Sequence, residues 1–264
     1  MRLRSVLFVP CGNPKAMAKA ATLTCDALIF DLEDAVGDSE RKAALLALSE
    51  ALKRPIVAKN VLVRLHPLHL DAIHEALDGV AIDGLVVPKV GDPDDLAPIR
   101  KLWPDMAVWA MIETARGVAN LRDIATCGLT GLIAGPNDLR KDLRTRPMPE
   151  RQDILLALSQ IVLHGRANDL FVLDGVYNNF RDEGGFSAEC QQGRSLGFDG
   201  KTLIHPAQID TAKAAFSPSE TEIAWAKAVI SAFDGNPAGV LSVSGEMVER
   251  LHLEQAEAIL ARAV

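Results

Sequence analysis

The sequence has few cysteines, no long hydrophobic run and no cluster of basic residues. Its four cysteines, Cys11, Cys25, Cys127 and Cys190, lack the CxxC spacing of a zinc site and the density of a disulfide-stapled secreted domain. We therefore expect a reducing, cytoplasmic location. No apolar run approaches the roughly 20 residues that cross a bilayer, so we expect no membrane partner. With a net charge of −7 and no run of Lys or Arg, we expect no nucleic-acid partner.

Common catalytic and nucleotide-binding motifs are also missing from the sequence. It contains no P-loop, no GxGxxG element and no ordered Ser/His/Asp set. What it does contain is enough apolar sequence, 48% of 264 residues, for one large core. Eight short apolar runs recur along most of the chain: Ser5–Pro10, Ala27–Glu33, Val61–Pro67, Gly84–Val90, Ala107–Glu113, Gly131–Gly135, Asp169–Val176 and Thr202–Pro206. Because these runs are continuous rather than alternating, they indicate strands buried on both faces of a parallel sheet.

Segments with helical spacing separate these runs, and they begin with recognisable capping sequences. Asp92-Pro93-Asp94-Asp95 and Ser217-Pro218-Ser219-Glu220 each offer a cap followed by an acid three residues later. Eight alternating strand–helix units predict an α/β fold, a (β/α)8 barrel, over residues 1–216. A doubly wound open sheet would give a similar pattern.

Residues 217–264 form a C-terminal helical extension in this interpretation. It would contain a helix near Thr221–Phe233, a Gly/Pro hinge, and a last helix from about Glu246 to Ala261. Such an extension could cover the active site, contact a neighbouring subunit, or pack beneath the barrel.

Polar side chains that follow the predicted strands are the candidate site residues, because barrel active sites lie at the C-terminal ends of the strands. Glu113 ends the fifth strand and Asp138 follows the sixth. Adjacent strands lie about 5 Å apart, so the two carboxylates can converge on one hard cation, Mg²⁺ or Mn²⁺. The alternative is that each acid caps the helix that follows.

Basic residues at other strand ends have both structural and functional interpretations. Arg64 lies within an apolar strand and needs an anionic partner, either Asp31 or Asp34 or a substrate oxygen. Lys89 could form a Schiff base, as in some aldolase barrels. Lys201 and His205 lie around the eighth strand, where barrels often bind phosphate, and for His205 hydrogen bonding is favoured over a general-base role.

Several ordered motifs together resemble the citrate lyase β-subunit-like branch of the HpcH/HpaI aldolase superfamily, the CoA-ester lyases. The motifs run nearly end to end: Arg4–Pro10, Asp31–Val36, Pro88–Val90, Ile112–Gly117, Asp174–Tyr177, Phe180–Asp182, and Gly197–Lys201 leading into Ile204–Gln208. The resemblance implies a homotrimeric or hexameric barrel that cleaves or forms a carbon–carbon bond beside an acyl thioester, acting on a CoA thioester and an oxo acid.

The resemblance also implies roles for particular residues. Glu113 and Asp138 would bind Mg²⁺, and Arg64 would contact the substrate enolate. Further residues would contact substrate or CoA (Phe8, Lys15, Ile204 and His205) or support these groups (Asp31, Glu33, Asp34 and Lys89).

The sequence departs from its relatives at some of these positions. Relatives use an aspartate of the C-terminal segment as acid or base, where this chain has Glu249, and Asn137 replaces an acid that often precedes the metal-binding aspartate. We expect a Mg²⁺-dependent lyase for a malyl-, citramalyl- or citryl-type CoA ester. A hydroxyacyl-CoA thioesterase and a non-catalytic CoA-ester-binding subunit are the alternatives.

Overall fold

The computed structural model describes residues 2–34, 36–37 and 40–263. The chain folds into two compact units, Leu3–Lys213 and Ala214–Val264. Of the described residues, none belongs to a helix long and apolar enough to cross a membrane.

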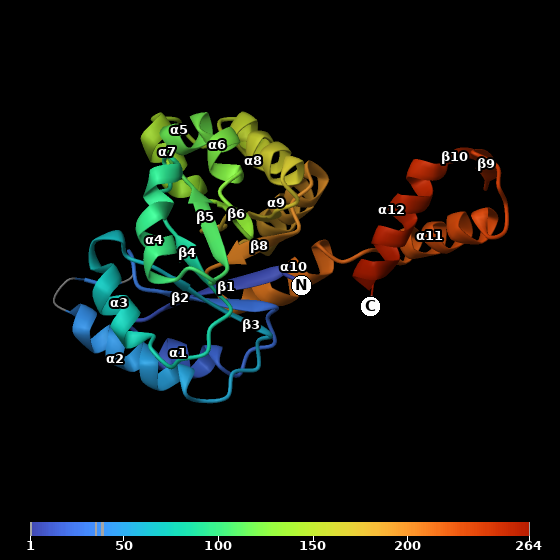
Figure 1. Ribbon diagram of the computed structural model, residues 1–264. Helices are drawn as coiled ribbons and strands as arrows, with labels where there is room; N and C mark the ends of the chain where they lie inside the picture. The colour runs from blue at the N-terminus through green and yellow to red at the C-terminus, as the bar shows by residue number, and fades with distance from the viewer. Residues whose placement is uncertain (1, 35, 38–39, 264) are drawn as a thin grey trace. The chain divides into compact units, whose positions relative to one another are not determined.

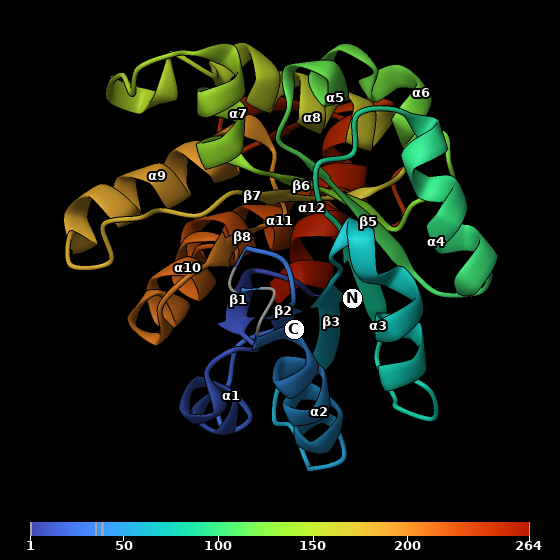
Figure 2. The ribbon, with the colours of Figure 1, turned by 90° about the vertical axis from the view of Figure 1, so that its left-hand side faces the viewer.

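The first unit is a closed barrel of eight parallel strands (Figures 1 and 2). Its strands are β1 (Ser5–Pro10), β2 (Ala27–Asp31), β3 (Asn60–Arg64), β4 (Gly84–Val87), β5 (Val108–Ile112), β6 (Gly131–Ala134), β7 (Phe171–Asp174) and β8 (Gly200–Leu203). The barrel closes because β1 pairs with both β2 and β8. The predicted (β/α)8 barrel is confirmed, and the doubly wound open sheet is wrong.

Helices surround the ring of strands, as the view in Figure 2 shows. The α-helices of this part are α1 (Pro14–Ala20), α2 (Arg41–Leu52), α3 (Leu70–Ala76), α4 (Ala97–Leu102), α5 (Ala115–Ala119), α6 (Leu121–Ala125), α7 (Pro136–Leu143), α8 (Leu155–Ala167), α9 (Glu183–Leu196) and α10 (Ile209–Ala215). The short 3-10 turns are η2 (Pro67–His69), η3 (Pro93–Leu96), η4 (Pro149–Arg151) and η5 (Pro206–Gln208). The predicted start at Asp92 forms a capping box with Asp95, although the first turn is the 3-10 turn η3.

The barrel interior is apolar through most of its depth and becomes polar at the C-terminal ends of the strands. On β3, Leu62 belongs to the interior core, and Arg64 two residues later lines the cavity above it. On β5, Met111 is in the core and Glu113 follows two residues later. Side chains alternate between the two faces of a strand, so a residue two positions beyond a core residue faces the same interior. This alternation is what directs the site residues into the barrel.

Seven of the eight strands are shorter than predicted at their C-terminal ends. The third was expected to reach Pro67 but pairs only to Arg64, and the fourth was expected to reach Val90 but ends at Val87. The eighth lies two residues earlier than predicted, at Gly200–Leu203. Hydrophobic character continues into the turns because the turn residues are also buried, as Leu65 and Val90 are. Burial therefore extends further along the chain than strand pairing does.

The second unit consists of two long helices and a hairpin: α11 (Glu220–Phe233), β9 (Val240–Val243), β10 (Glu246–Glu249) and α12 (Arg250–Ala263). Its core includes Val229 and Phe233 of α11 and Ala256 of α12. The predicted helix start at Glu246 is wrong, because Glu246–Glu249 pairs with β9 and the helix begins at Arg250. The predicted cap at Ser217 is also displaced, since the capping box joins Ser219 and Glu222.

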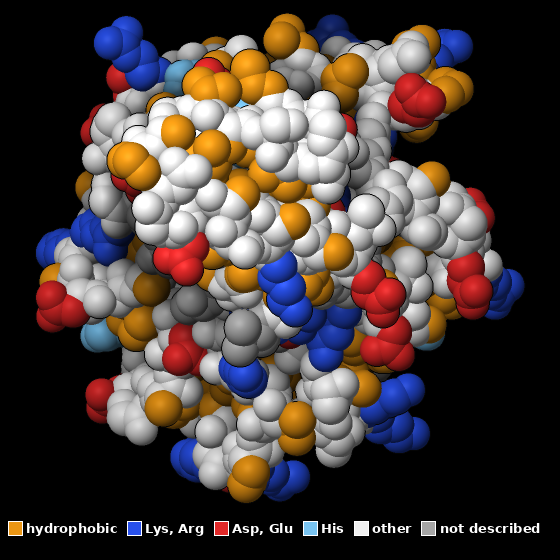
Figure 3. All heavy atoms as spheres, turned by 90° about the vertical axis from the view of Figure 1, so that its right-hand side faces the viewer, with side chains coloured by type: hydrophobic (Ala, Val, Ile, Leu, Met, Phe, Trp, Pro, Cys, Tyr) orange, Lys and Arg blue, Asp and Glu red, His pale blue; other side chains and the backbone are white. Residues whose placement is uncertain are grey.

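Charged side chains of both signs occur on the molecular surface. On the face shown in Figure 3, the basic and acidic groups are interspersed with one another and with hydrophobic side chains.

Candidate active site

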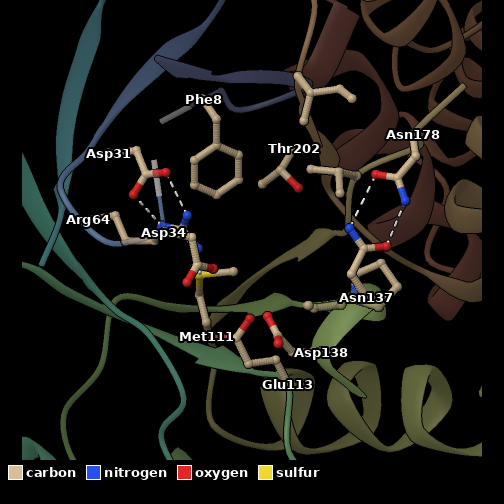
Figure 4. Close-up of a pocket in the computed structure, with 15 residues that line it drawn as sticks. Phe8, Asp31, Asp34, Arg64, Met111, Glu113, Asn137, Asp138, Asn178 and Thr202 are labelled. Carbon is tan, nitrogen blue, oxygen red and sulfur yellow. Dashed lines mark hydrogen bonds and ion pairs between the residues drawn. The ribbon is translucent and has the colours of Figure 1, made fainter. Parts of the chain in front are cut away.

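A cavity of about 200 Å³ opens at the C-terminal ends of the barrel strands (Figure 4). Residues from β1, β2, β3, β5, β6, β7 and β8, or from the segments after them, contribute to its wall. The lining residues are Phe8, Asp31, Asp34, Arg64, Met111, Glu113, Ala134, Gly135, Pro136, Asn137, Asp138, Val176, Asn178, Thr202 and Ile204. The cavity lies where barrel enzymes place their chemistry.

The two carboxylates Glu113 and Asp138 lie side by side in the floor of this cavity, as Figure 4 shows. Glu113 directly follows β5 and is 2% exposed, and its Oε1 accepts the backbone N–H of Lys89 at 2.8 Å. Asp138 is half-buried in the first turn of α7, which begins at Pro136. Burial raises the pKa of Glu113 to about 7, and the nearby charges of Glu33 and Asp138 act in the same direction.

The residues around these two acids fit a hard divalent cation. Among the described residues that line the cavity, Asp31, Asp34, Glu113 and Asp138 are acidic and Arg64 is basic, while the Lys89 ammonium lies 3.5 Å from Asp34. Acids outnumber cations at the site, and it therefore attracts positive charge. A Cβ atom at Gly135 would overlap with the Glu113 side chain, and the glycine therefore leaves the space that Glu113 occupies. Among the described residues, no group of three or more His, Cys, Asp or Glu side chains is arranged to hold a metal. Water and substrate oxygens would complete the shell, as Mg²⁺ commonly requires.

Arg64 forms a two-pronged ion pair with Asp31. Its Nε donates to Oδ1 at 2.7 Å and its Nη2 to Oδ2 at 2.6 Å, while Nη1 lies 2.9 Å from Glu33 Oε2. The Phe8 ring covers the guanidinium, 5.0 Å from Cζ to the ring centroid. Burial opposes the charged form, but Asp31 and Glu33 outweigh it and raise the pKa of Arg64. Of the predicted partners, Asp31 makes the salt bridge and Asp34 does not. Asp31 and Glu33 together contact all three guanidinium nitrogens, so only the N–H groups that neither acid uses remain for a substrate.

Lys89 contacts Glu33 through its side chain and Glu113 through its backbone N–H. Its ammonium pairs with Glu33 and lies 3.5 Å from Asp34. Its backbone has φ +53°, a left-handed conformation that is uncommon for a residue with a side chain. Although burial lowers the pKa of Lys89, the hydrogen bond and charge of Glu33 outweigh it and raise the pKa. A Schiff-base lysine needs an unprotonated amine, so these contacts argue against that alternative.

The predicted CoA contacts are distributed unevenly around the cavity. Phe8 and Ile204 line it, and Ile204 is 40% exposed. His205 does not line it; its Nδ1 accepts the backbone N–H of Ala207, and its ring stacks on Phe180 with centroids 4.5 Å apart. The hydrogen bond caps the 3-10 turn η5 that follows His205, and a role for His205 at the site stays a prediction. Lys15 is exposed in the first turn of α1 and is outside the cavity lining.

The phosphate-binding interpretation of Lys201 is wrong. Lys201 is 0% exposed, and its Nζ donates to Asp174 and to Glu189, each at 2.8 Å. Arg151 donates to the other Asp174 oxygen at 2.6 Å. Lys201 lies beside Thr202, which lines the cavity, so strand alternation directs the lysine away from the barrel interior. A buried and paired ammonium is not available to a phosphate.

Sequence reasoning missed several cavity residues. Met111, Thr202 and Asn178 line the cavity, and Thr202 Oγ1 donates to the Asp174 carbonyl at 3.0 Å. Their positions at or just beyond strand ends were the available signal. Glu249 belongs to the second unit, where its backbone N–H donates to His252 Nδ1 at 2.9 Å. Its acid–base role stays a prediction.

A (β/α)8 barrel with acidic side chains at the C-terminal ends of its strands is typical of α/β-barrel enzymes, and comparison with known proteins shows the family to which the chain belongs. The HpcH/HpaI aldolase/citrate lyase family model matches residues 4–206. A second model, for C–C bond lyases of the TIM-barrel fold, matches residues 151–264. The chain belongs to the HpcH/HpaI aldolase/citrate lyase family.

Individual relatives cover nearly the whole chain. A (3S)-malyl-CoA thioesterase of Cereibacter sphaeroides (strain KD131) is 43% identical, covering 98% of this chain and 94% of that protein. The citrate lyase subunit beta of Leuconostoc mesenteroides subsp. cremoris is 32% identical, covering 98% and 93%. A crystal structure of protein CitE from Mycobacterium tuberculosis, in complex with magnesium, acetoacetate and coenzyme A, has a TM-score of 0.84 and 31% identity, covering 98% and 97%. The predicted family is confirmed, and the thioesterase alternative is supported better than the lyase.

Proposed function

We propose that this protein hydrolyses the thioester of a short 3-hydroxyacyl-CoA of the malyl type, with Mg²⁺ as its cofactor. The observation that carries the proposal is the 43% identity to a (3S)-malyl-CoA thioesterase over 98% of the chain, against 32% to a citrate lyase subunit beta. In the reaction, water adds to the thioester carbonyl carbon and the carbon–sulfur bond breaks. The thiolate of CoA takes up a proton, and the free hydroxy acid is the other product.

The size of the cavity supports a small acyl group. Clefts that enclose drug-sized ligands usually measure about 300 to 1,000 Å³, whereas this cavity measures about 200 Å³. It has room for a four- or five-carbon acyl group but not for the nucleotide of CoA. The nucleotide would therefore lie outside, near the exposed Ile204, and Lys15 remains a candidate contact for it.

Glu113 and Asp138 are the residues that would hold the cation. When bound, Mg²⁺ supplies a Lewis acid that polarises an acyl oxygen and offsets negative charge. Among the surrounding residues, Asp31 fixes the orientation of Arg64 through two hydrogen bonds, and Phe8 shields the guanidinium from water. The N–H groups of Arg64 that neither Asp31 nor Glu33 uses can then stabilise negative charge on the acyl group. Glu249 is our candidate for moving the proton, on the basis of the family resemblance.

Cleavage of the carbon–carbon bond is the second candidate function. It is favoured by the match to the C–C bond lyase model and by the citrate lyase relatives. For malyl-CoA this reaction would give acetyl-CoA and glyoxylate instead of CoA and malate. The family resemblance implies a homotrimeric or hexameric barrel, and we propose one of these assemblies as the active form.

The products separate the two functions. We expect purified protein with Mg²⁺ and malyl-CoA to release free thiol and malate in equal amounts, with no glyoxylate. Acetyl-CoA and glyoxylate in place of these products would establish the lyase and refute hydrolysis.

Removal of the metal site is the accompanying test. EDTA should abolish turnover and added Mg²⁺ should restore it. Glu113→Ala should remove both turnover and Mg²⁺ binding measured by calorimetry, while circular dichroism remains that of a folded barrel. Undiminished activity in Glu113→Ala would contradict the metal assignment.

A further inference from the structure

Lys89 has an uncommon backbone conformation at a position that contacts Glu113. It lies two residues beyond β4, and its φ of +53° is in the left-handed region that a side chain disfavours. Such a conformation persists only where the surrounding contacts hold it. The contacts of Lys89 therefore indicate what the conformation is for.

The backbone N–H of Lys89 is one of these contacts, and it donates to Glu113 Oε1 at 2.8 Å. On the far side of Lys89, the Val90 N–H donates to the Met111 carbonyl at 3.3 Å. The φ angle of Lys89 sets the direction of its own N–H relative to this second bond, so the left-handed value allows both bonds to form. The bond to Oε1 restrains rotation of the Glu113 carboxylate, as hydrogen bonds to metal-binding carboxylates commonly do.

The side chain of Lys89 is anchored at its far end. Its ammonium pairs with Glu33 and lies 3.5 Å from Asp34 Oδ1. The Glu33 side chain is 5% exposed, and its other oxygen lies 2.9 Å from Arg64 Nη1. Because Glu33 is held from two directions, it is a fixed point to which the Lys89 side chain is tied. The tie limits the conformations that the Lys89 backbone can adopt.

The charge of Lys89 has the opposite effect on a bound cation. The ammonium is close enough for the charge of Asp138 to act on it, and like charges repel. As a charge alone, Lys89 would weaken the binding of Mg²⁺ at Glu113 and Asp138. The effect of its charge and the effect of its backbone N–H therefore differ in sign, and an experiment can separate them.

We propose that Lys89 is a positioning residue for Glu113 as a metal ligand. The ion pair with Glu33 holds the left-handed conformation in which the Lys89 N–H fixes the Glu113 carboxylate for Mg²⁺. The inference rests on the proposed function, because it takes Glu113 and Asp138 as the residues that hold the cation. It does not depend on which bond of a CoA ester is broken.

Replacement of Lys89 by alanine and by glycine separates the backbone conformation from the charge. Both variants lose the ammonium, but only alanine keeps the Cβ atom that disfavours a positive φ. Lys89→Ala should lower the Mg²⁺ affinity measured by calorimetry by about tenfold, the lower end of the range for residues that support a metal ligand. Lys89→Gly should stay within about threefold of the wild type, because glycine adopts the left-handed conformation without the ion pair.

Lys101→Ala is the control for the loss of one lysine. Lys101 is exposed on α4 and is outside the cavity lining, so its replacement should leave the Mg²⁺ affinity unchanged. Circular dichroism and thermal unfolding of all three variants would show whether each remains a folded barrel.

Two results would overturn the inference. If Lys89→Ala and Lys89→Gly both bind Mg²⁺ as tightly as the wild type or more tightly, Lys89 acts only as a repelling charge. If both variants lose affinity equally, the backbone conformation is not the means by which Lys89 acts.

The calorimetry uses Mg²⁺ without a CoA ester, which separates this inference from the thioesterase assignment. A wild-type protein that binds Mg²⁺ but hydrolyses no ester would refute the thioesterase and leave the comparison of Lys89→Ala with Lys89→Gly decisive for Lys89. A wild-type protein that binds no Mg²⁺ would overturn the role of Lys89 together with the metal assignment.

Discussion

Replacing Asp174 with asparagine should destabilise the barrel, because it leaves two buried cations with too little negative charge. Asp174 and Lys201 are both 0% exposed, and Arg151 is also buried. Asp174 accepts from Lys201 at 2.8 Å and from Arg151 at 2.6 Å, and Glu189 accepts from Lys201 at 2.8 Å. The four groups are formally neutral together. Asp174→Asn removes one of the two negative charges.

The size of the effect follows from the burial of these groups. Removing one partner of a buried ion pair costs about 3–5 kcal/mol. Asparagine keeps the volume and one oxygen acceptor, so we expect about 3 kcal/mol, the lower end of that range. For a protein of this length, 1 kcal/mol corresponds to about 2–4 °C in Tm, and the variant should melt about 6–12 °C below the wild type.

Thermal unfolding followed by circular dichroism would measure this loss. The control is Glu50→Gln, which breaks an ion pair to Lys53 whose side chains are 65% and 60% exposed; its Tm should match the wild type within error, since exposed pairs contribute little. Adding Lys201→Met to Asp174→Asn should recover part of the lost stability, because it removes the uncompensated buried charge. A Tm for Asp174→Asn within about 2 °C of the wild type, where at least 6 °C is expected, would refute the reasoning.

The ion-pair cluster around Asp174 also predicts that the stability of the fold falls at acidic pH. Burial by itself raises the pKa of Asp174, but Lys201 and Arg151 outweigh it and hold the pKa below its ordinary value. A depressed pKa contributes stability above the unfolded pKa, about 3.9 for aspartate, and that stability is lost as pH falls through the folded value. The gap in Tm between the wild type and Asp174→Asn should therefore be full near neutral pH and shrink below about pH 4.

Two further substitutions test local features of the barrel. Gly135→Ala should displace the Glu113 carboxylate and reduce Mg²⁺ affinity by about tenfold or more, as the loss of a residue that supports a metal ligand does. The control is Gly184→Ala, whose added Cβ meets nothing closer than 3.8 Å and should leave the affinity unchanged. Equal Mg²⁺ affinities of the two variants in calorimetry would contradict the prediction. Arg144 ends α7 in a left-handed conformation with φ +57°, so Arg144→Gly should stabilise the fold by about 0.5–1 kcal/mol in chemical denaturation. A loss of stability there would mean that the arginine side chain matters more than its backbone conformation.

Much of the barrel was encoded in local sequence. Eight continuous apolar runs predicted eight buried parallel strands, because a strand covered on both faces has no need for polar alternation. The same rule misjudged strand ends, since Leu65 and Val90 are buried in turns. The predicted last helix included Glu246–Glu249, where pairing with β9 across the tight turn at Ser244 and Gly245 makes a hairpin instead. Tertiary pairing outweighs local propensity in such short segments.

The sequence by itself determined which acids stand at the ends of neighbouring strands, and Glu113 and Asp138 accordingly face one cavity. Only the tertiary structure decided which groups pair. Arg64 bonds Asp31 rather than Asp34 because the β2–β3 register sets Asp31 opposite Arg64. Lys201 is buried outside the barrel interior, and Asn137 meets Asn178. Register, side-chain direction and loop approach depend on contacts between residues far apart in the chain, and no local pattern carries that information.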